Sequence, residues 1–351
     1  AMICTSTHDS KRSEDVRLRI SVISEVAEDW RRHVGRWSRL NRYKKVLVND
    51  TPAPSRTDEY LLYQTLFGTW PLAPPDAQKL AAYRERIEAY MLKAAREAKV
   101  HTSWINPNAE YEAALQRFVQ TLLHDPGHNA FLADFMPLQQ RLARFGLLHS
   151  LSQILLKLTI PGVPDIYQGD ELWCFNLVDP DNRRPVDYAG RNALLQSLMQ
   201  QLEAGQAQQD LCRELLAQLE DGRAKLYVTW QTLAVRNRYP QLFRDGDYLA
   251  LDASGAKAEH LVAFNRRLDD EEVIVVAARW FALLLGEHND PLPGPECWGD
   301  TCIELPPGAQ TKSYRDAFTN EPVTPLLRED KYILAATDLL RHFPLVLLMR
   351  E

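Results

Sequence analysis

The sequence has few cysteines and no pattern among them. Its five cysteines in 351 residues form no Cys-x-x-Cys pair, and they lie at Cys4, Cys174, Cys212, Cys297 and Cys302. An odd, scattered set of thiols favours free cysteines in a reducing compartment over a disulfide framework. We therefore expect a cytoplasmic protein, in which Cys297 and Cys302 are ordinary loop thiols and not half of a zinc site.

Long apolar runs and an excess of basic residues are also missing. The most apolar stretch, from Leu148 to Ile160, contains His149 and Lys157, so neither a signal peptide nor a membrane span is expected. The 41 Lys and Arg residues are mixed with 47 Asp and Glu residues, for a net charge of −6. A chain of this charge lacks the basic surface of nucleic-acid-binding proteins. We expect neither nucleic acid nor membrane as a partner.

What is present is an ordinary globular composition, with 45% apolar and 25% charged residues. Its length suggests about two or three domains, and we find no internal repeat. Ala1 precedes Met2, which suggests a piece of a longer protein.

Apolar residues at helical spacing dominate residues 13 to about 158. One helix is expected from an N-cap at Ser13 to about Trp37, and a second after a cap at Thr57. Further helices are expected around residues 80–98, 111–122 and 131–158, the last possibly broken near Pro137 and Gly146.

The pattern changes after residue 158. Residues 160–171 contain a short buried strand between prolines and glycines, and helices follow from about Asn192 to Arg238 with a break near Gly222. Beyond Tyr239 the apolar residues alternate, which predicts strands at residues 260–267, 271–280, 302–306, 312–319 and 343–349.

Three polar stretches follow strands or adjoin them. In the first, "TSTHDSKRSED" (residues 5–15), a strand over Met2–Thr7 runs into His8 and Asp9, with Lys11 and Arg12 next. Active sites of parallel barrels assemble at such strand ends. The alternative is a polar turn that caps the following helix.

The second and third stretches are "PGVPDIYQGDE" (161–171) and "DPDNRRP" (179–185). The second places polar groups just past a strand, although a structural turn at Gly169 would explain it too. The third holds two carboxylates, an amide and two guanidiniums, a set that suits hydroxyl-rich ligands. Its alternative is a surface loop of salt bridges.

Together, the three stretches resemble motifs of the maltooligosyl trehalose synthase family, glucosylmutases in the α-amylase clan of glycoside hydrolases. "STHDSKRSEDVR" (6–17) is similar to the family's seventh-strand motif, which usually has Thr where Ser10 stands here. "PGVPDIYQGDELW" (161–173) resembles the eighth strand, and "LVDPDNRRPVDY" (177–188) the loop after it. The resemblance continues through "KLYVTWQTLAVRNRYPQLFRDGDY" (225–248) and covers essentially the whole chain.

The resemblance implies a mixed α and β fold that is the C-terminal part of a (β/α)8 barrel enzyme. Residues 1–12 would be barrel strand 7 with the catalytic-Asp motif, and residues 13–145 a large helical insertion. Residues 146–240 would complete the barrel with helix 7, strand 8, its loop and helix 8. Residues 241–351 would form a small all-β C-terminal domain, a β-sandwich.

The resemblance also implies roles for individual residues. Asp9 would be the third catalytic carboxylate, which stabilises an oxocarbenium-like transition state. The expected substrate-binding residues are His8, Lys11, Arg12, Asp181, Arg183 and Arg184. Asp170 and Glu171 would orient their neighbours. No cofactor and no metal are implied.

In the family, the nucleophile and the general acid lie on the fourth and fifth barrel strands, and no stretch here resembles either motif. We therefore expect a fragment that is inactive alone, with its first strand displaced or paired with a neighbouring molecule. The implied partners are a maltooligosaccharide or α-glucan substrate, the N-terminal half of the barrel, and a trehalose-releasing trehalohydrolase in the same pathway. A non-catalytic α-glucan-binding or assembly fragment and another glucanotransferase of the clan are the alternatives.

Two further patterns have alternatives as well. His124 and His128 are spaced like metal ligands on a helix, but Pro126 and Gly127 favour a loop. The aromatic residues of the first helices would line a sugar groove or, as is more usual at helical spacing, form a core. These are Trp30, Trp37, Tyr60, Tyr63, Phe67 and Trp70.

Overall fold

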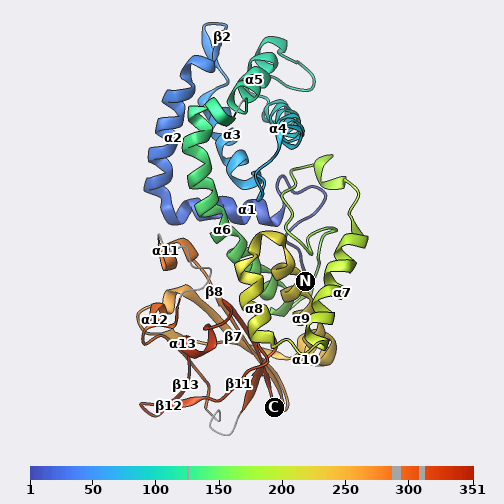
Figure 1. The fold of residues 1–351 in the computed structure, drawn as a ribbon, viewed down its shortest axis with the longest axis vertical. Helices are drawn as coiled ribbons and strands as arrows, with labels where there is room; N and C mark the ends of the chain where they lie inside the picture. Colours follow the sequence, from blue (N-terminus) through green and yellow to red (C-terminus); the bar gives the residue numbers. More distant parts are fainter. Residues whose placement is uncertain (125, 287–293, 308–312) are drawn as a thin grey trace. The chain divides into compact units, whose positions relative to one another are not determined.

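The computed structural model describes residues 1–124, 126–286, 294–307 and 313–351 (Figure 1). The chain has a mixed α and β fold and divides into two compact units. The helical unit comprises residues 8–144 and 175–184, and the sheet unit comprises residues 1–7, 145–174 and 185–351. The division falls within helix α6 (Ala130–Thr159).

The helical unit is built from α-helices with one short hairpin. Its further helices are α1 (Glu14–Ser21), α2 (Ala27–Asn41), α3 (Arg56–Thr69), α4 (Ala77–Ala98) and α5 (Ala109–Leu122). Four 3-10 turns join them or follow: η1 (Val22–Val26), η2 (Arg42–Lys44), η3 (Pro126–His128) and η4 (Asp181–Arg183). The hairpin strands β2 (Val46–Val48) and β3 (Thr51–Ala53) are antiparallel.

Several expected boundaries in this unit are wrong. The helix expected from Ser13 to about Trp37 is interrupted by η1. Helix α3, for which a cap at Thr57 was expected, is capped by Ser55, because the Ser55 hydroxyl accepts a hydrogen bond from the Asp58 amide. The hairpin β2–β3 lies where two prolines predicted only a break. Helix α6 continues through Pro137, which is exposed together with Ala133, so the carbonyl group that the proline leaves unbonded faces solvent.

Aromatic side chains fill the core of the helical unit. Trp37 is fully buried and packs edge-to-face against Trp30, Tyr63, Phe131 and Phe135 at ring-centroid separations of 5.3–5.6 Å. Such offset geometry suits the quadrupoles of the rings. Of the six aromatic residues considered for a sugar groove, only Tyr60 is exposed. The others are core residues.

The sheet unit begins with a two-stranded parallel sheet. Strand β1 (Met2–Ile3) pairs with β4 (Val163–Pro164) through Val163 N–H to Ala1 O at 2.9 Å and Asp165 N–H to Ile3 O at 2.8 Å. The expectation of a displaced first strand is therefore wrong. Gly162 permits this pairing, because a Cβ there would lie 2.5 Å from Ile3 Cδ1.

Helices and two larger antiparallel sheets make up most of this unit. The longer helices are α7 (Tyr188–Glu203), α8 (Gln208–Ala217), α9 (Arg223–Arg238) and α10 (Pro240–Asp245), and η5 (Leu219–Asp221) precedes α9. Gly222, with φ of 83°, marks the expected break, and Gly205, with φ of 92°, marks another.

The larger sheet has six strands in the order β11-β10-β14-β8-β7-β5, and the smaller has four in the order β12-β13-β9-β6. The six strands are β5 (Asp247–Ala250), β7 (Leu261–Leu268), β8 (Glu271–Ala278), β10 (Tyr314–Asp316), β11 (Pro322–Val323) and β14 (Leu345–Arg350). The four are β6 (Ala253–Ser254), β9 (Cys302–Glu304), β12 (Leu326–Arg328) and β13 (Lys331–Ala335). Short helices accompany the sheets: η6 (Ala258–His260), α11 (Phe281–Leu285), α12 (Pro295–Trp298) and α13 (Ala336–Leu339).

The expected strands over 260–267, 271–280, 302–306 and 343–349 correspond to β7, β8, β9 and β14. Of the strand expected at 312–319, Lys312 lies outside the described residues and β10 covers the centre. Strands β8 and β14 are almost wholly buried and pair with each other, so they form the centre of the larger sheet.

Candidate functional site

The predicted catalytic carboxylate lies in an exposed loop at the start of the helical unit. The Asp9 side chain is 83% exposed, and its Oδ2 lies 3.2 Å from His8 Nε2, whose side chain is 58% exposed. An acid and an imidazole that face solvent together can both reach a ligand. Both side chains of this pair are therefore accessible to a ligand.

Lys11 and Arg12 extend from the same loop toward α3 and α4. The Lys11 ammonium donates to Glu97 Oε2 at 2.8 Å, and this hydrogen bond raises the pKa of Lys11. Arg12 donates to Thr65 Oγ1 at 3.2 Å, and its guanidinium lies 6.0 Å from the centroid of the Tyr90 ring. Both cations help to hold the loop that carries Asp9.

The second polar loop, residues 179–184, is centred on a buried carboxylate. Asp181 Oδ2 accepts a hydrogen bond from the Leu177 amide at 2.8 Å and lies 3.4 Å from Arg86 Nε. Its Oδ1 lies 2.9 Å from Arg184 Nη2. Because the Asp181 side chain is only 9% exposed, it shapes the loop, whereas Arg184 at 61% exposure faces solvent.

The remaining members of this loop are likewise paired. Arg183 Nε lies 2.7 Å from Asp179 Oδ1, and its side chain is 55% exposed. The Asp179 carbonyl accepts a hydrogen bond from Lys93 Nζ at 2.6 Å. The loop therefore presents two arginines to solvent from a backbone that Lys93 and Asp181 hold.

The two loops lie side by side within the helical unit. Asn182 Nδ2 donates to the His8 carbonyl at 2.8 Å, and the Ser13 amide donates to the Asn176 carbonyl at 2.9 Å. Arg12 and Leu177 form an isolated antiparallel bridge. Motifs about 170 positions apart in the sequence thus form one polar surface, with every predicted site residue in the same unit.

Sequence analysis missed the supporting residues on α4, which are Arg86, Lys93 and Glu97. Their spacing of seven and four residues places them on one face of the helix. That spacing was the available signal, because a polar stripe on an otherwise amphipathic helix implies polar partners.

The third motif, residues 161–171, lies in the sheet unit. Glu171 Oε2 is 3.1 Å from Arg191 Nε, and Arg191 Nη2 donates to the Gly169 carbonyl at 3.0 Å. Gly169 has φ of 91°, a conformation that favours glycine. Glu171 therefore contacts a neighbouring side chain that also holds the turn.

Neither a metal site nor a membrane helix is found in the described part of the chain. No cluster of three or more His, Cys, Asp and Glu side chains there could hold a metal ion. Among the described residues, no helix is both long and apolar enough to cross a membrane.

Comparison with known proteins gives a consistent result. No protein-family model matches the chain. Two Mycobacterium tuberculosis proteins, from strains CDC 1551 and H37Rv, are assigned as maltooligosyl trehalose synthases and are 33% identical to it over 351 residues. The chain is related along its whole length to maltooligosyl trehalose synthases.

Solved structures of maltooligosyl trehalose synthases are also similar to the chain along almost its whole length. The maltooligosyltrehalose synthase from Arthrobacter ramosus is 32% identical over 100% of the chain, with a TM-score of 0.74. A hypothetical maltooligosyl trehalose synthase from Sulfolobus tokodaii is 28% identical over 99% of it, with a TM-score of 0.65. The chain spans 38% of the length of each of these relatives.

Proposed function

We propose that the chain is the C-terminal portion of a maltooligosyl trehalose synthase and supplies one of its three catalytic carboxylates. The whole enzyme would convert the reducing-end α-1,4 linkage of a maltooligosaccharide into an α,α-1,1 linkage. The observation that carries the proposal is the joining of the two polar loops through Asn182 and His8. It joins the loop that carries an exposed acid to the loop that carries two exposed guanidiniums, groups that suit a chain of hydroxyl groups.

Asp9 is the catalytic residue in this proposal. Its carboxylate would hold hydroxyl groups of the sugar at the cleaved bond and stabilise the positive charge of the transition state. His8, which lies 3.2 Å from Asp9, would bind the same sugar. The exposed ends of Lys11, Arg183 and Arg184 and the half-buried Arg12 would contact the substrate, while the buried Asp181 would position Arg184.

The chain alone is inactive in this proposal. Retaining glycosidase chemistry needs a nucleophile and a general acid about 5 Å apart, and the part of the relatives that the chain does not match would carry both. That part would be the N-terminal half of the barrel. Strands β1 and β4 of this chain would be the seventh and eighth strands of the whole barrel. A trehalose-releasing hydrolase would consume the product in the cytoplasm.

Complementation tests this proposal. The purified chain is mixed with the portion of the Arthrobacter ramosus synthase that it does not match, and maltopentaose is assayed for loss of reducing ends. We expect activity from the mixture only, and a loss of about 10²–10³-fold with Asp9→Asn, comparable to the loss of one electrostatic stabiliser of a transition state.

Asp245→Asn is the matched control, because Asp245 is also exposed and pairs with its neighbour in sequence, Arg244, at 2.8 Å. It should leave the activity unchanged. A non-reducing product from the chain alone, or full activity with Asp9→Asn, would contradict the proposal. Binding of maltopentaose without recovered turnover would favour a non-catalytic glucan-binding fragment.

A further inference from the structure

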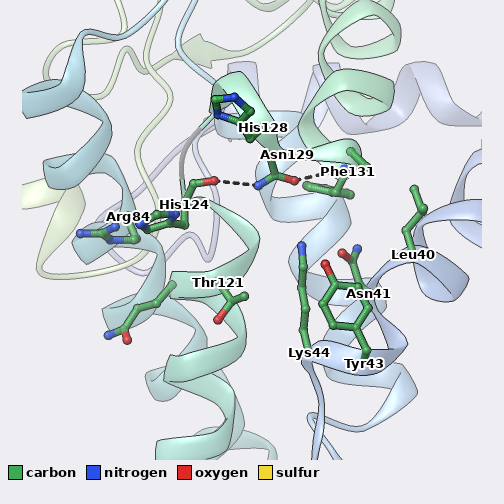
Figure 2. A pocket seen from close by; sticks show the side chains of 12 residues that line it. Leu40, Asn41, Tyr43, Lys44, Arg84, Thr121, His124, His128, Asn129 and Phe131 are labelled. Atoms are coloured by element: carbon green, nitrogen blue, oxygen red, sulfur yellow. Dashed lines mark hydrogen bonds between the residues drawn. The ribbon is translucent and has the colours of Figure 1, made fainter.

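A second polar surface of the helical unit is a pocket of about 820 Å³ that the motifs above do not include. Its lining comes from the end of α2, from η2, α4 and α5, and from the start of α6. Figure 2 shows the side chains of Asn41, Tyr43 and Lys44 extending toward Asn129 and toward Phe131 at the start of α6. The volume is in the range of small-molecule sites.

Asn41 contributes a buried acceptor without a donor. Its side chain is fully buried, and its Nδ2 donates to Tyr63 Oη at 2.9 Å. The Tyr63 hydroxyl in turn donates to Glu59 Oε1 at 2.7 Å, and burial raises the pKa of Tyr63, so the phenol keeps its proton. The Tyr63 oxygen can therefore only accept from Asn41, which fixes the orientation of the amide. Asn41 Oδ1 is left with no hydrogen-bond partner among the described residues.

A buried acceptor of this kind normally has a partner, and leaving it without one costs about 1–3 kcal/mol. The missing partner must donate a hydrogen bond. A ligand hydroxyl group meets that requirement, whereas a bare phosphate or carboxylate anion does not.

The charge of the pocket is the second observation. Lys44 is half-buried, burial lowers its pKa, and no described carboxylate forms an ion pair with it. Arg84, the other cation of the lining, is only weakly compensated, with its Nε 3.8 Å from Glu88 Oε1. The described lining residues include no Asp or Glu. An anionic group on the ligand would neutralise the Lys44 ammonium.

We infer that this pocket binds a phosphate monoester that carries vicinal hydroxyl groups. The phosphate group would contact Lys44, and a hydroxyl group would donate to Asn41 Oδ1. Tyr43, whose side chain is largely exposed, would cover the sugar ring from η2. A sugar phosphate and a nucleotide share this chemistry.

Isothermal titration of the purified chain tests the inference without any turnover. The probes are glucose 1-phosphate, AMP, inorganic phosphate and maltotriose. We expect one of the first two to bind at least about tenfold more tightly than inorganic phosphate, and maltotriose to bind weakly or not at all. Comparison of glucose 1-phosphate with AMP identifies the source of the phosphate ester.

Variants locate the site. Lys44→Gln should weaken binding about tenfold or more, since it removes a charged hydrogen bond, and Lys44→Arg should restore most of it. Lys79→Gln is the control, because Lys79 is an exposed lysine of α4 outside the pocket. Glucose 1-phosphate and AMP both failing to bind at millimolar concentration would overturn the inference. So would binding that is unaffected by Lys44→Gln, inorganic phosphate binding as tightly as either ester, or maltotriose binding as tightly as both.

Discussion

Arg266 and Asp316 of the sheet unit are satisfied differently from Glu112, Asp134 and Asp181 of the helical unit. In the sheet unit, the Arg266 guanidinium is 1% exposed and donates to five backbone carbonyls, those of Thr159, Leu242, Phe243, Gly246 and Asp247. The buried Asp316 there accepts from the backbone amides of Phe318, Thr319 and Leu347 and from the Thr319 hydroxyl.

In the helical unit, three carboxylates with little exposure pair with other side chains, whereas the buried Arg19 donates to the carbonyls of Gly68 and Trp70. Glu112 binds Arg96 through both carboxylate oxygens at 2.8 and 2.6 Å, and Asp134 binds His33, Arg36 and Trp37. Asp181 pairs with Arg86 and Arg184 in the same manner.

This difference has a consequence for function. A charge bonded to the backbone fixes the path of the chain, and its removal leaves several main-chain groups without partners. A charge paired with side chains can tolerate changes nearby, because each partner has its own contacts. All the candidate site residues lie in the helical unit, where polar side chains face one another and solvent.

The largest expected effect is on the backbone-bonded arginine. Arg266→Met should lower the free energy of unfolding by about 4 kcal/mol, because several buried carbonyl groups lose their donor at once. Urea denaturation monitored by circular dichroism measures this change.

Arg267→Met is its matched control, since Arg267 is the exposed neighbour whose side chain, among the described residues, donates only to the Asp269 carbonyl at 3.2 Å. It should change stability by no more than about 0.5 kcal/mol. Equal effects of the two substitutions would show that bonding to the backbone carries no special weight in the sheet unit.

The sequence predicted the elements that depend on local pattern. Alternating apolar residues identified β7 and β8, and helical spacing identified α4 and α5. The hairpin β2–β3 was missed because Pro52 and Pro54 indicate a turn, whereas the hairpin depends on packing against Tyr111 and Ala114 of α5. Contacts between distant segments decide such elements.

The candidate site shows the same limit. The motifs around Asp9 and Asp181 could be found from their amino-acid sequence, and the resemblance to the maltooligosyl trehalose synthase family supplied their expected roles. The burial of Asp181 could not be predicted from the sequence, because it depends on Arg86 of α4, 95 positions away in the sequence. Asn41, with its unsatisfied oxygen, has no sequence signal at all.

The next prediction uses pH to separate the units. Burial raises the pKa of Asp316 to about 6 from 3.8, so its stabilising contribution is full below about pH 4 and is lost as the pH rises through 6. The loss is on the order of 2–3 kcal/mol. In the helical unit, the hydrogen bonds from Arg96 lower the pKa of Glu112. Its contribution is therefore present above 4.5 and is lost as the pH falls through the lowered value.

The two units should thus respond to pH in opposite directions. Hydrogen exchange measured by mass spectrometry between pH 4 and 7, corrected for intrinsic rates, should show peptides around 314–319 losing protection as the pH rises. Peptides around 96–112 should not lose protection over this range. Asp316→Asn should abolish the trend in the sheet unit, and a trend that persists in this variant would assign it to another group.

The smallest expected effect compares the two carboxylates of the candidate site itself. Asp181→Ala should destabilise the chain by about 2 kcal/mol, because it leaves the Leu177 amide without its acceptor and the partly buried Arg86 without its ion-pair partner. Asp9→Ala should change stability by no more than about 0.5 kcal/mol, since the Asp9 side chain is 83% exposed.

Thermal melts of both variants, with Asp181→Asn as the variant that keeps the shape and one oxygen, measure the difference. If Asp9 carries substrate chemistry and Asp181 carries structure, Asp9→Ala loses activity in the complemented enzyme at unchanged stability, whereas Asp181→Ala loses both. A stability loss for Asp9→Ala equal to that for Asp181→Ala would instead make the first loop a structural turn, which is the alternative of a polar turn that caps the following helix.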